Sequence, residues 1–533
     1  MKRFGSMLFT STLVLLATFF VAQSTFATTY YIATSGSDSN DGTTKNTPWL
    51  HVPGMATATG TAGSHSAVAG DVFILRGCDV WFNASFPLVL SHGGASGNPV
   101  TIGVDQTWFN SGSCSVWNRP IFDAHTSASS STPMEINGSG GQATGCVGGD
   151  GNYFIAFHAS NITLSWIEMR NLYWANDAQN SCWAGNGWWR ASSVDNITVS
   201  HTYEHNWSMH AYQANTFGDV DIAVWVDGPP NCPHCRLDYN VADNCATTHG
   251  TGTLVGGSLS FVNTTHSIFK CMSNAIKPIF AGEIGWNEVT QNGESPDPTV
   301  HDNVIETVDA QGNGGIYYIH DNRLHDYFSG EGLQIGNPGE TDYVWNNTWS
   351  GLLQVGANGP QVPQSETPVS MFFWNNTVVD WSGCIQDASH GYSWSNTFKS
   401  QNNLCINSSG SSSSGSPSAP TKTISNNFGM TDSAATTAGY TAGQVRPFSP
   451  TSGTSPSVGA GTNLASVWPA GFPTSDASLI CTEQTVNTVV QAVCTGTPVT
   501  RPASGAWDVG AYQFSTASTS KPNPPTGLKA TVQ

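Results

Sequence analysis

The sequence predicts an all-β solenoid, a tube of stacked coils in which each coil contributes short strands. Few windows have the 3.6-residue apolar spacing of a helix. Short apolar or alternating runs are instead broken by Gly, Asn, Asp and Ser, which is typical of strands and turns. A cassette of one or two apolar or aromatic residues, an Asn and a short strand-like run recurs along the chain. Such self-similarity is the signature of a repeat architecture.

The recurring asparagines set the expected length of one coil. They cover 187 residues in eight intervals, a mean near 23. Coils of this length stack at the ~4.8 Å spacing of strands. We therefore expect the asparagines to form a ladder whose amides bind backbone in a tight turn, since Asn tolerates left-handed geometry there. The series is Asn240, Asn263, Asn287, Asn303, Asn322, Asn347, Asn376, Asn403 and Asn427.

The composition excludes several classes of protein. Among 533 residues, 17 are Lys or Arg and 36 are Asp or Glu, which gives a formal net charge of −19. This charge does not suit nucleic acid or an anionic membrane surface. Aromatic residues make up 11% of the chain, which argues against general disorder. We expect a monomer with no nucleic-acid partner.

The N-terminus has the pattern of a secretory signal peptide. Lys2 and Arg3 precede an apolar run at 13–22, and small residues end at Ala27. The run is shorter than the ~20 residues that a membrane span requires. We expect residues 1–27 to be removed and the protein to be secreted, extracellular or periplasmic, without a membrane span.

The sequence divides the remaining chain into two parts. Residues 28–515 form one large repeat domain, and residues 516–533 are a tail rich in Ser, Thr and Pro. Such a tail is a linker or a frayed end.

Twelve cysteines, all beyond residue 77, indicate disulfides in an exported chain. Cys384 and Cys405 lie 21 residues apart and Cys245 and Cys271 lie 26 apart, so each pair is expected to link neighbouring coils. Cys232 and Cys235 have the spacing of a metal or redox motif, but no second such motif follows. A structural disulfide, with each other or with Cys245 or Cys271, is the favoured interpretation.

Three parts of the chain resemble the pectate-lyase-like, right-handed parallel β-helix superfamily. Residues 30–49 resemble its opening segment, residues 69–81 with 96–104 its first coils, and residues 455–464 with 501–514 its closing coil. The resemblance implies a right-handed parallel β-helix in a single large domain, and polysaccharide as the ligand. It does not fix the activity, because the fold hosts lyases, hydrolases, epimerases and non-catalytic proteins.

Candidate catalytic residues lie in the densest polar stretch, 301–331. Because the interior of such a solenoid is filled, a site must lie in a groove on an outer sheet. His320 and His325 are candidate bases for a lyase, and Asp326 and Glu331 follow them. A hydrolase needs two carboxyls roughly 5–10 Å apart.

Asp302 and Asp321 lie 19 residues apart, so they are expected to stack on neighbouring coils. Their repulsion would be relieved by a bound cation such as Ca²⁺. The alternative is that both are turn residues that bind their own backbone. The chain has no run like the calcium cluster of calcium-dependent pectate lyases.

Trp188, Trp189 and Lys277 are candidate substrate-binding residues. The tryptophans can stack on sugars, or equally fill the core. Lys277 is one of few lysines in the middle of the chain, and its alternative role is that of a solvated surface lysine.

Two functions stay open on the sequence. The first is an exported lyase or glycoside hydrolase that cleaves polysaccharide in a groove near 301–331. The second is a non-catalytic β-helix that binds carbohydrate or acts at the cell surface or in a matrix. A metal or redox role for Cys232 and Cys235 is a third option. No cofactor other than Ca²⁺ is indicated.

Overall fold

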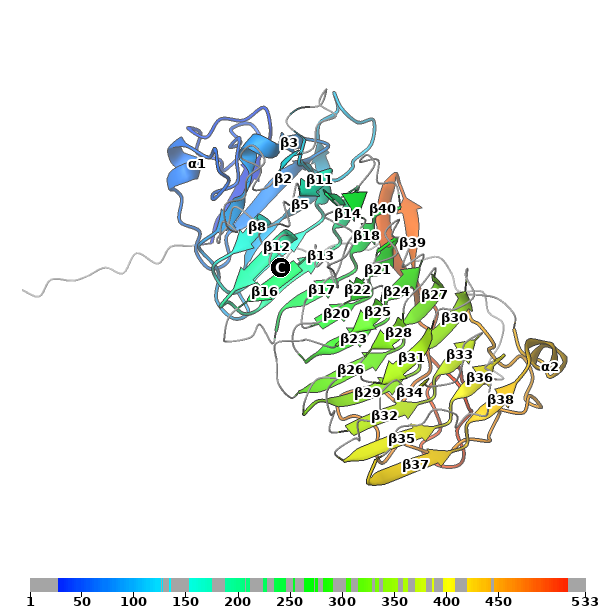
Figure 1. Ribbon diagram of the computed structural model, residues 1–533. Helices are drawn as coiled ribbons and strands as arrows, with labels where there is room; N and C mark the ends of the chain where they lie inside the picture. Colours follow the sequence, from blue (N-terminus) through cyan, green and yellow to red (C-terminus); the bar gives the residue numbers. More distant parts are fainter. Residues whose placement is uncertain are drawn as a thin grey trace, which may run out of the picture.

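The computed structural model shows a right-handed parallel β-helix, as the resemblance implies (Figure 1). Nearly all of its strand pairs are parallel, and neighbours in a sheet come from successive coils. The structure describes residues 27–125, 127, 134–135, 153–174, 187–206, 208–210, 224–227, 234–245, 253–254, 263–272, 274–276, 281–290, 303–307, 315–327, 331–334, 339–352, 358–362, 370–379, 386–387, 396–407, 419–441 and 445–515.

The first sheet has 13 strands, which run the length of the solenoid. They are β1 (Thr29–Ile32), β2 (Val72–Gly77), β5 (Val100–Phe109), β9 (Ile162–Ser165), β13 (Ile197–Ser200), β17 (Arg236–Asp238), β20 (Asn263–Thr265), β23 (Glu283–Gly285), β26 (Ile316–His320), β29 (Thr341–Trp345), β32 (Ser370–Trp374), β35 (Thr397–Gln401) and β37 (Thr421–Ser425).

The second sheet has 12 strands, and most of them directly follow a strand of the first. They are β3 (Val80–Phe82), β6 (Ile121–Asp123), β10 (Glu168–Arg170), β14 (Tyr203–His205), β18 (Val241–Asp243), β21 (Ile268–Lys270), β24 (Glu288–Thr290), β27 (Arg323–Tyr327), β30 (Thr348–Leu352), β33 (Thr377–Val379), β36 (Leu404–Ile406) and β38 (Phe428–Met430).

Shorter sheets complete the coils. One has four strands, β4 (Leu88–Leu90), β8 (Tyr153–Phe157), β12 (Gly187–Ser192) and β16 (Val224–Asp227), and another has five, β22 (Asn274–Ile276), β25 (Asn303–Glu306), β28 (Glu331–Gln334), β31 (Asn358–Val362) and β34 (Gln386–Asp387). A third has β7 (Met134–Glu135), β11 (Leu172–Trp174), β15 (Ser208–His210) and β19 (Thr253–Leu254). The helices are short: α1 (Gly60–Ser64), the 3₁₀ turn η1 (Asn83–Ser85) and α2 (Asp432–Thr437).

Apolar residues from every coil fill the interior as one continuous core. Val289, Leu324 and Trp349 are neighbours on successive strands of the second sheet, and each is fully buried. The same alternation places the residues on either side of them on the outer face. A solenoid built in this way buries its apolar surface between coils and needs no separate hydrophobic domain.

A corner of two residues joins the first sheet to the second in coil after coil. Asn347 illustrates its hydrogen bonds: its amide nitrogen donates to the Ile319 carbonyl at 2.9 Å and to the side-chain oxygen of Asn376 at 3.1 Å. Its own side-chain oxygen accepts from the backbone and the side chain of Asn322. We call this series the inner ladder. Its members are Asn240, Ser267, Asn287, Asn322, Asn347, Asn376, Asn403 and Asn427.

The predicted ladder is confirmed, with two of its members wrong. Asn263 is the first residue of β20 and Asn303 the first residue of β25, so both lie outside the corner. Ser267 holds the ladder position of the coil between Asn240 and Asn287: its hydroxyl accepts from the Asn240 backbone at 3.1 Å. An Asn next to a strand-like run occurs both at a corner and at the start of a strand. The cassette alone does not distinguish these two positions, and so it placed Asn263 and Asn303 wrongly.

The residue before each ladder member, and the residue at the same position in two earlier coils, has a left-handed backbone, with φ between 52° and 62°. We call this series the outer column. Its first half consists of aromatic and His side chains, stacked at 4.6 to 5.1 Å between ring centroids. Its second half consists of short polar side chains. The column is Trp166, His201, Tyr239, His266, Trp286, Asp321, Asn346, Asn375, Asn402 and Asn426.

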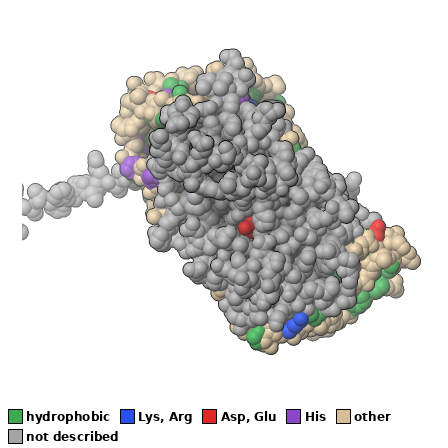
Figure 2. All heavy atoms as spheres, viewed as in Figure 1, with side chains coloured by type: hydrophobic (Ala, Val, Ile, Leu, Met, Phe, Trp, Pro, Cys, Tyr) green, Lys and Arg blue, Asp and Glu red, His purple; other side chains and the backbone are tan. Residues whose placement is uncertain are grey.

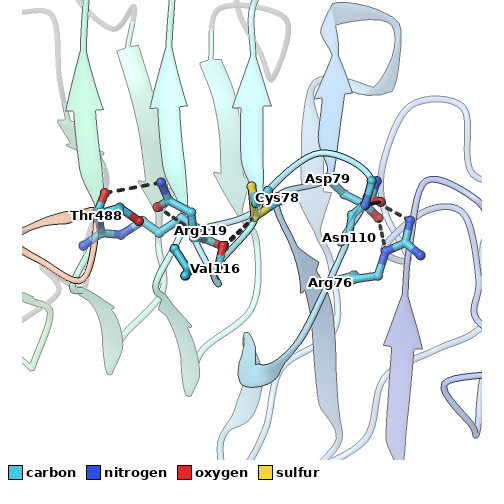
Figure 3. Close-up of a disulfide and its surroundings, with 10 residues drawn as sticks. Arg76, Cys78, Asp79, Asn110, Val116, Arg119 and Thr488 are labelled. Carbon is cyan, nitrogen blue, oxygen red and sulfur yellow. Dashed lines mark hydrogen bonds and ion pairs between the residues drawn. A yellow bond between two sulfur atoms is a disulfide. The ribbon is translucent and has the colours of Figure 1, made fainter.

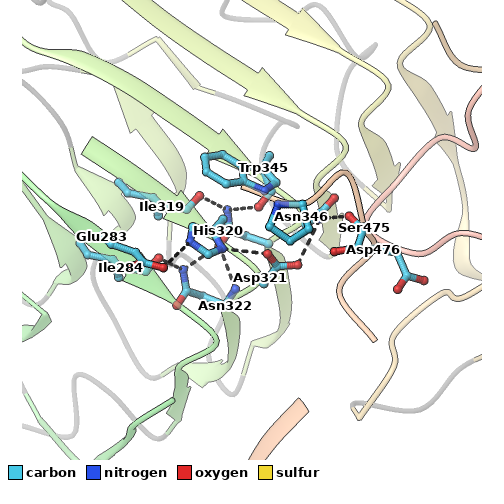
Figure 4. Close-up of polar contacts among 12 residues, drawn as sticks. Glu283, Ile284, Ile319, His320, Asp321, Asn322, Trp345, Asn346, Ser475 and Asp476 are labelled. Atoms are coloured by element: carbon cyan, nitrogen blue, oxygen red, sulfur yellow. Dashed lines mark hydrogen bonds and ion pairs between the residues drawn. The ribbon is translucent and has the colours of Figure 1, made fainter. Parts of the chain in front are cut away.

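The polar half of the outer column binds a C-terminal strap, residues 459–514, which runs back along the solenoid. Asn402 donates to the Thr462 carbonyl at 2.8 Å, and Asn375 donates to that of Asp508 at 2.8 Å. Asn346 donates to the Ser475 carbonyl at 2.6 Å (Figure 4). The strap is therefore held by one side chain per coil.

The strap turns around in a hairpin, β39 (Ile480–Val486) and β40 (Val489–Thr495). This hairpin lies beside β14, β18, β21 and β24 (Figure 1). The Cys481–Cys494 disulfide closes the hairpin. Near its tip, Asn118 donates to the Thr488 carbonyl at 3.4 Å. This contact lies close to the Cys78–Cys114 disulfide, beside the Arg76–Asp79 ion pair (Figure 3).

The disulfide prediction is confirmed for one pair of coils. Cys245 and Cys271 form a disulfide across 26 residues. Cys405 is disulfide-bonded too, while Cys384 lies outside the described residues. Cys235 is disulfide-bonded and fully buried, which agrees with the favoured interpretation of a structural disulfide. Cys232 is outside the described residues.

Neutral side chains dominate the described surface in the view of Figure 2, where few Lys, Arg, Asp or Glu side chains are visible. This agrees with the 10% of charged residues in the sequence. In the described part of the chain, no helix is both long and apolar enough to span a bilayer.

Replacing a middle member of the inner ladder will destabilise the protein. Asn347→Ala leaves the buried amide groups of Asn322 without their acceptor, and each unsatisfied buried group costs about 1–3 kcal/mol. We expect the free energy of unfolding in denaturant to fall by about 3 kcal/mol. Asn46→Ala, at an exposed position, is the control. Equal stability of the two variants would contradict a ladder that stabilises the fold.

Candidate functional site

The outer face of the second sheet has one row of polar side chains on successive coils, and all of them except Thr290 are ionisable. Strand registers align each of them with the next, from Asp123 on β6 to His325 on β27. We call this row the charged column. Its members are Asp123, Arg170, His205, Asp243, Lys270, Thr290 and His325.

At one end of the charged column, His325 lies between two carboxylates. Its Nδ1 is 2.7 Å from Asp326 and its Nε2 is 2.9 Å from Glu288. Arg323 also pairs with Glu288. Burial lowers the pKa of His325, but its hydrogen bonds to Asp326 and Glu288 outweigh this effect and raise the pKa above 6.5. The imidazole is therefore disposed to carry a proton near neutral pH.

At the other end, Glu168 lies between a guanidinium and an imidazole. Arg170 Nη1 is 3.2 Å from Glu168, and His205 Nε2 is 3.1 Å from the same oxygen. Arg170 also binds Asp123 at 2.8 Å. Although burial raises the pKa of Glu168, its bond to His205 and the nearby positive charges lower it overall. This carboxyl is therefore ionised at neutral pH.

Between the two ends, the hairpin borders the charged column. Lys270 Nζ is 2.9 Å from Asp243 on the neighbouring strand and 2.8 Å from Glu483 on β39. These bonds outweigh burial and raise the pKa of Lys270. The hairpin thus contributes a carboxylate to the column and forms one of its flanks.

The two end clusters are too far apart to act on one bond. β10 and β27 are separated by five strand steps, which is roughly 24 Å at ~4.8 Å a step. The paired carboxyls of glycosidases lie within about 10 Å of each other. Each cluster must therefore be considered as a separate centre.

The structure does not bring the four predicted catalytic residues into one groove. His325 and Asp326 belong to the cluster described above. His320 ends β26 in the first sheet and is 1% exposed. Glu331 begins β28, in the five-stranded sheet, next to Asn303 and Asn358; its side chain lies outside the described part of the structure.

His320 is buried beneath the strap (Figure 4). Its ring stacks on Trp345 at 4.5 Å and meets the ring of Phe472 at 5.1 Å. Its nitrogens lie 2.8 Å from Asp321 and 3.3 Å from Glu283. Burial lowers the pKa of His320, but these two carboxylates raise it overall. A polymer cannot reach this imidazole, and we correct its catalytic assignment to a role in anchoring the strap.

Asp321 has the partners of a corner residue. It accepts from Asn346 at 3.1 Å and binds His320, so both of its oxygens are engaged. Burial raises its pKa. No group of three metal-binding side chains occurs among the described residues, and Asp302 lies outside them. The residues present do not fit a Ca²⁺ site at Asp321.

The tryptophans fill the core. Trp188 is 1% exposed and Trp189 is fully buried. Trp188 meets the ring of Phe154 edge-on at 5.6 Å, and Trp189 stacks on Phe157. Neither can stack on a sugar, so the core interpretation replaces the substrate-binding one. Lys277 lies outside the described residues.

Sequence reasoning missed most of the charged column, although a signal was present. His205, Asp243, Lys270, Thr290 and His325 each lie three residues after the ladder position of their coil. Aligning the cassettes on that offset would have selected the column. Glu483 had no such signal, because it comes from a hairpin far along the chain.

No protein-family model matches the chain, and no curated protein sequence matches it. Solved structures show a similarity of low identity. A GH136 lacto-N-biosidase from Eubacterium ramulus is 12% identical with a TM-score of 0.40, over 76% of this chain and 68% of that one. Pectate lyase Pel9A is 12% identical with a TM-score of 0.36, over 91% of this chain and 96% of that one.

A PL6 family alginate lyase, AlyGC, is also 12% identical, with a TM-score of 0.38 over 69% of this chain. The match spans 50% of the length of that lyase. At such low identity the likeness does not extend to site residues.

Glu204, directly behind the charged column, will make stability depend on pH. It accepts from Thr202 at 2.6 Å, its other oxygen has no hydrogen-bond partner, and burial raises its pKa from 4.5 to about 7. A raised pKa in the folded state contributes stability below pH 4.5 that is lost as the pH rises through 7. Glu204→Gln removes this loss. We compare the free energy of unfolding of the variant with that of the natural protein at each pH. Above pH 7 we expect this difference to be roughly 3 kcal/mol more in favour of the variant than at pH 4.

Denaturant unfolding across this pH range measures the effect. A difference between Glu204→Gln and the natural protein that stays constant with pH would contradict the raised pKa. A difference that grows between the two pKa values would support it.

Proposed function

We propose that the chain is an exported β-helix protein that binds a linear polysaccharide along the charged column and cleaves it there. The observation that carries this proposal is the register of the column, in which successive coils, except the one with Thr290, place an ionisable side chain in one row. A row repeating at ~4.8 Å offers equivalent contacts to successive units of an extended polymer. The hairpin borders the row on one flank, where Glu483 pairs with Lys270.

The cluster at His325 is the proposed site of cleavage: His325 and Glu288 are each 7% exposed, against 1% for His320, and the Asp326 side chain is 20% exposed. The imidazole separates the carboxyls of Glu288 and Asp326 by the width of its ring and two hydrogen bonds. Such a separation suits a pair of carboxyls acting on one glycosidic bond. His325, with its raised pKa, supplies the proton, and an adjacent carboxylate acts as base or nucleophile. Glu331 stays in the proposal as a second acid of the same coil.

The cluster at Glu168 is proposed to bind the polymer away from the cleavage point. Arg170 and His205 are 30% and 23% exposed in their side chains, so they present hydrogen-bond donors at the surface. Charge-assisted hydrogen bonds to sugar hydroxyls are stronger than neutral ones. Loss of this cluster should therefore weaken binding more than turnover.

Export is part of the proposal. The expected signal peptide at 1–27 supports it, and so do the disulfides of the described residues, which persist in oxidising compartments. The substrate would then be an extracellular or periplasmic polysaccharide.

One observation favours the second candidate, a non-catalytic carbohydrate-binding protein. Within the column, Arg170, Lys270 and His325 each have two carboxylate partners. A fully paired row can serve as a polar binding surface without releasing any group for chemistry. Binding without turnover would identify this candidate.

Variants at the His325 cluster test cleavage. His325→Ala, Asp326→Asn and Glu288→Gln should each lower kcat about 10²- to 10⁴-fold, because each removes a group proposed for proton transfer or charge stabilisation. The measurement is incubation with a polysaccharide panel, followed by assays for new reducing ends and for unsaturated products that absorb ultraviolet light.

His205→Ala, at the distant cluster, is the comparison variant. We expect it to raise KM and to change kcat by less than about tenfold. If the natural protein cleaves a polymer and all three His325-cluster variants match its kcat, the assignment of the cleavage site is wrong.

A further inference from the structure

We infer that the polysaccharide bound along the charged column is a neutral glycan and not a polyuronate or a sulfated polymer. The inference rests on the function proposed above and adds the chemical class of the substrate. It follows from the charges of the column, taken together with their pairing.

No permanent cation of the column is left for a polymer's own charge. Arg170 binds Asp123 and Glu168. Lys270 binds Asp243 and Glu483 at 2.9 and 2.8 Å. A carboxylate of the polymer would have to displace one of these partners, and each displacement forfeits an ion pair already formed. Arg323 likewise faces Glu288.

The described part of the column has a surplus of negative charge. Its four permanent cations, Arg119, Arg170, Lys270 and Arg323, face six carboxylates, which is a surplus of two negative charges while the imidazoles are neutral. The carboxylates are Asp123, Glu168, Asp243, Glu288, Asp326 and Glu483. With His325 protonated, one negative charge of this surplus remains. A polyanion along this row therefore meets a net negative charge.

The remainder of the chain adds to this repulsion. The whole sequence, column included, has a formal net charge of −19, with 17 basic residues in 533. Beyond a Debye length of about 8 Å, salt screens these charges, so the local surplus determines the repulsion of a polyanion in contact with the column. At low salt the net charge also slows the approach of a polyanion.

The same side chains suit the hydroxyl groups of a neutral sugar. Carboxylates accept hydrogen bonds from hydroxyls, and the exposed edges of Arg170 and His205 donate to them. These bonds require no rearrangement of the ion pairs, since an ionised carboxylate has about four acceptor sites. A neutral glycan thus gains contacts where a polyanion would lose them.

Cleavage of such a substrate is hydrolysis. Elimination needs an acidic hydrogen beside a carboxyl or ester group, which a neutral sugar without uronic acid or uronate ester units lacks. In hydrolysis the bond between the anomeric carbon and the glycosidic oxygen breaks. The hydroxyl of a water adds to that carbon, and the leaving oxygen takes up a proton. Nothing is oxidised or reduced.

Matched polymers that differ in charge alone test the inference. The probes are homogalacturonan as its methyl ester and as the free acid, and cellulose as its hydroxyethyl and carboxymethyl ethers. Affinity electrophoresis of the full chain gives the binding constant in low and high salt, and reducing-end assays give turnover. We expect the neutral member of a pair to bind at least tenfold more tightly at low salt, with a gap that narrows as salt rises.

The outcomes separate the inference from the function on which it rests. Tighter binding or faster cleavage of the anionic member, lost in His325→Ala, would overturn the inference and leave the proposed function in place. Absence of binding and cleavage throughout the panel would overturn both. Preference for the neutral member supports both.

One variant should alter the preference in a defined direction. Glu483→Gln leaves Lys270 with a single carboxylate, and we expect it to raise affinity for the free-acid polymer roughly two- to fivefold at low salt. Asp105→Asn is the matched control, because it frees Lys45 from its partner at 2.6 Å in the N-terminal region, away from the column. An equal effect of both variants, or none from Glu483→Gln, would place the polymer elsewhere and overturn the inference.

Discussion

The hydrogen bonds of the two-residue corner are the constraint on which the remainder of the structure depends. Each inner-ladder side chain accepts from the backbone of the previous coil and donates to a carbonyl, and from Asn322 onward it also accepts from the side chain of the previous ladder residue. This bonding fixes how far one coil is rotated against the next. Because the second sheet begins directly after the corner, the same bonds align Asp243, Lys270 and His325 in one row. The register of the site is thus inherited from the corner.

The fold could be predicted because its signal is local and repeated. An apolar pair, an Asn and a short strand describe both a corner and a layer of core, and Asn322, Asn347 and Asn376 were placed correctly on that basis. Where a coil departs from the pattern the prediction failed. Ser267 replaces Asn, and Asn303 begins a strand instead of preceding one. Uneven spacing between coils hides such exceptions.

The site was harder to predict because it depends on contacts that are distant in sequence. His320 and His325 are close in the chain, yet one lies under the strap and the other on the outer face of the second sheet. Density of polar residues cannot separate these two positions, whereas the offset from the ladder residue can. No pattern near Lys270 in the sequence predicts that Glu483, 213 residues away, is its ion-pair partner. The burial of Trp188 and Trp189 likewise depends on contacts with another coil, through Phe154 and Phe157.

The return of the strap gives this solenoid an unusual order of assembly. The coils make contacts with their immediate neighbours, so they can form one after another as the chain grows. The hairpin, at 480–495, packs on coils that contain Tyr239 and Trp286. Those rings therefore stay exposed to solvent while more than 190 further residues are synthesised. The growing chain therefore exposes the aromatic half of the outer column to solvent until nearly the whole polypeptide has been made. Its folding is completed by the last segment to be synthesised.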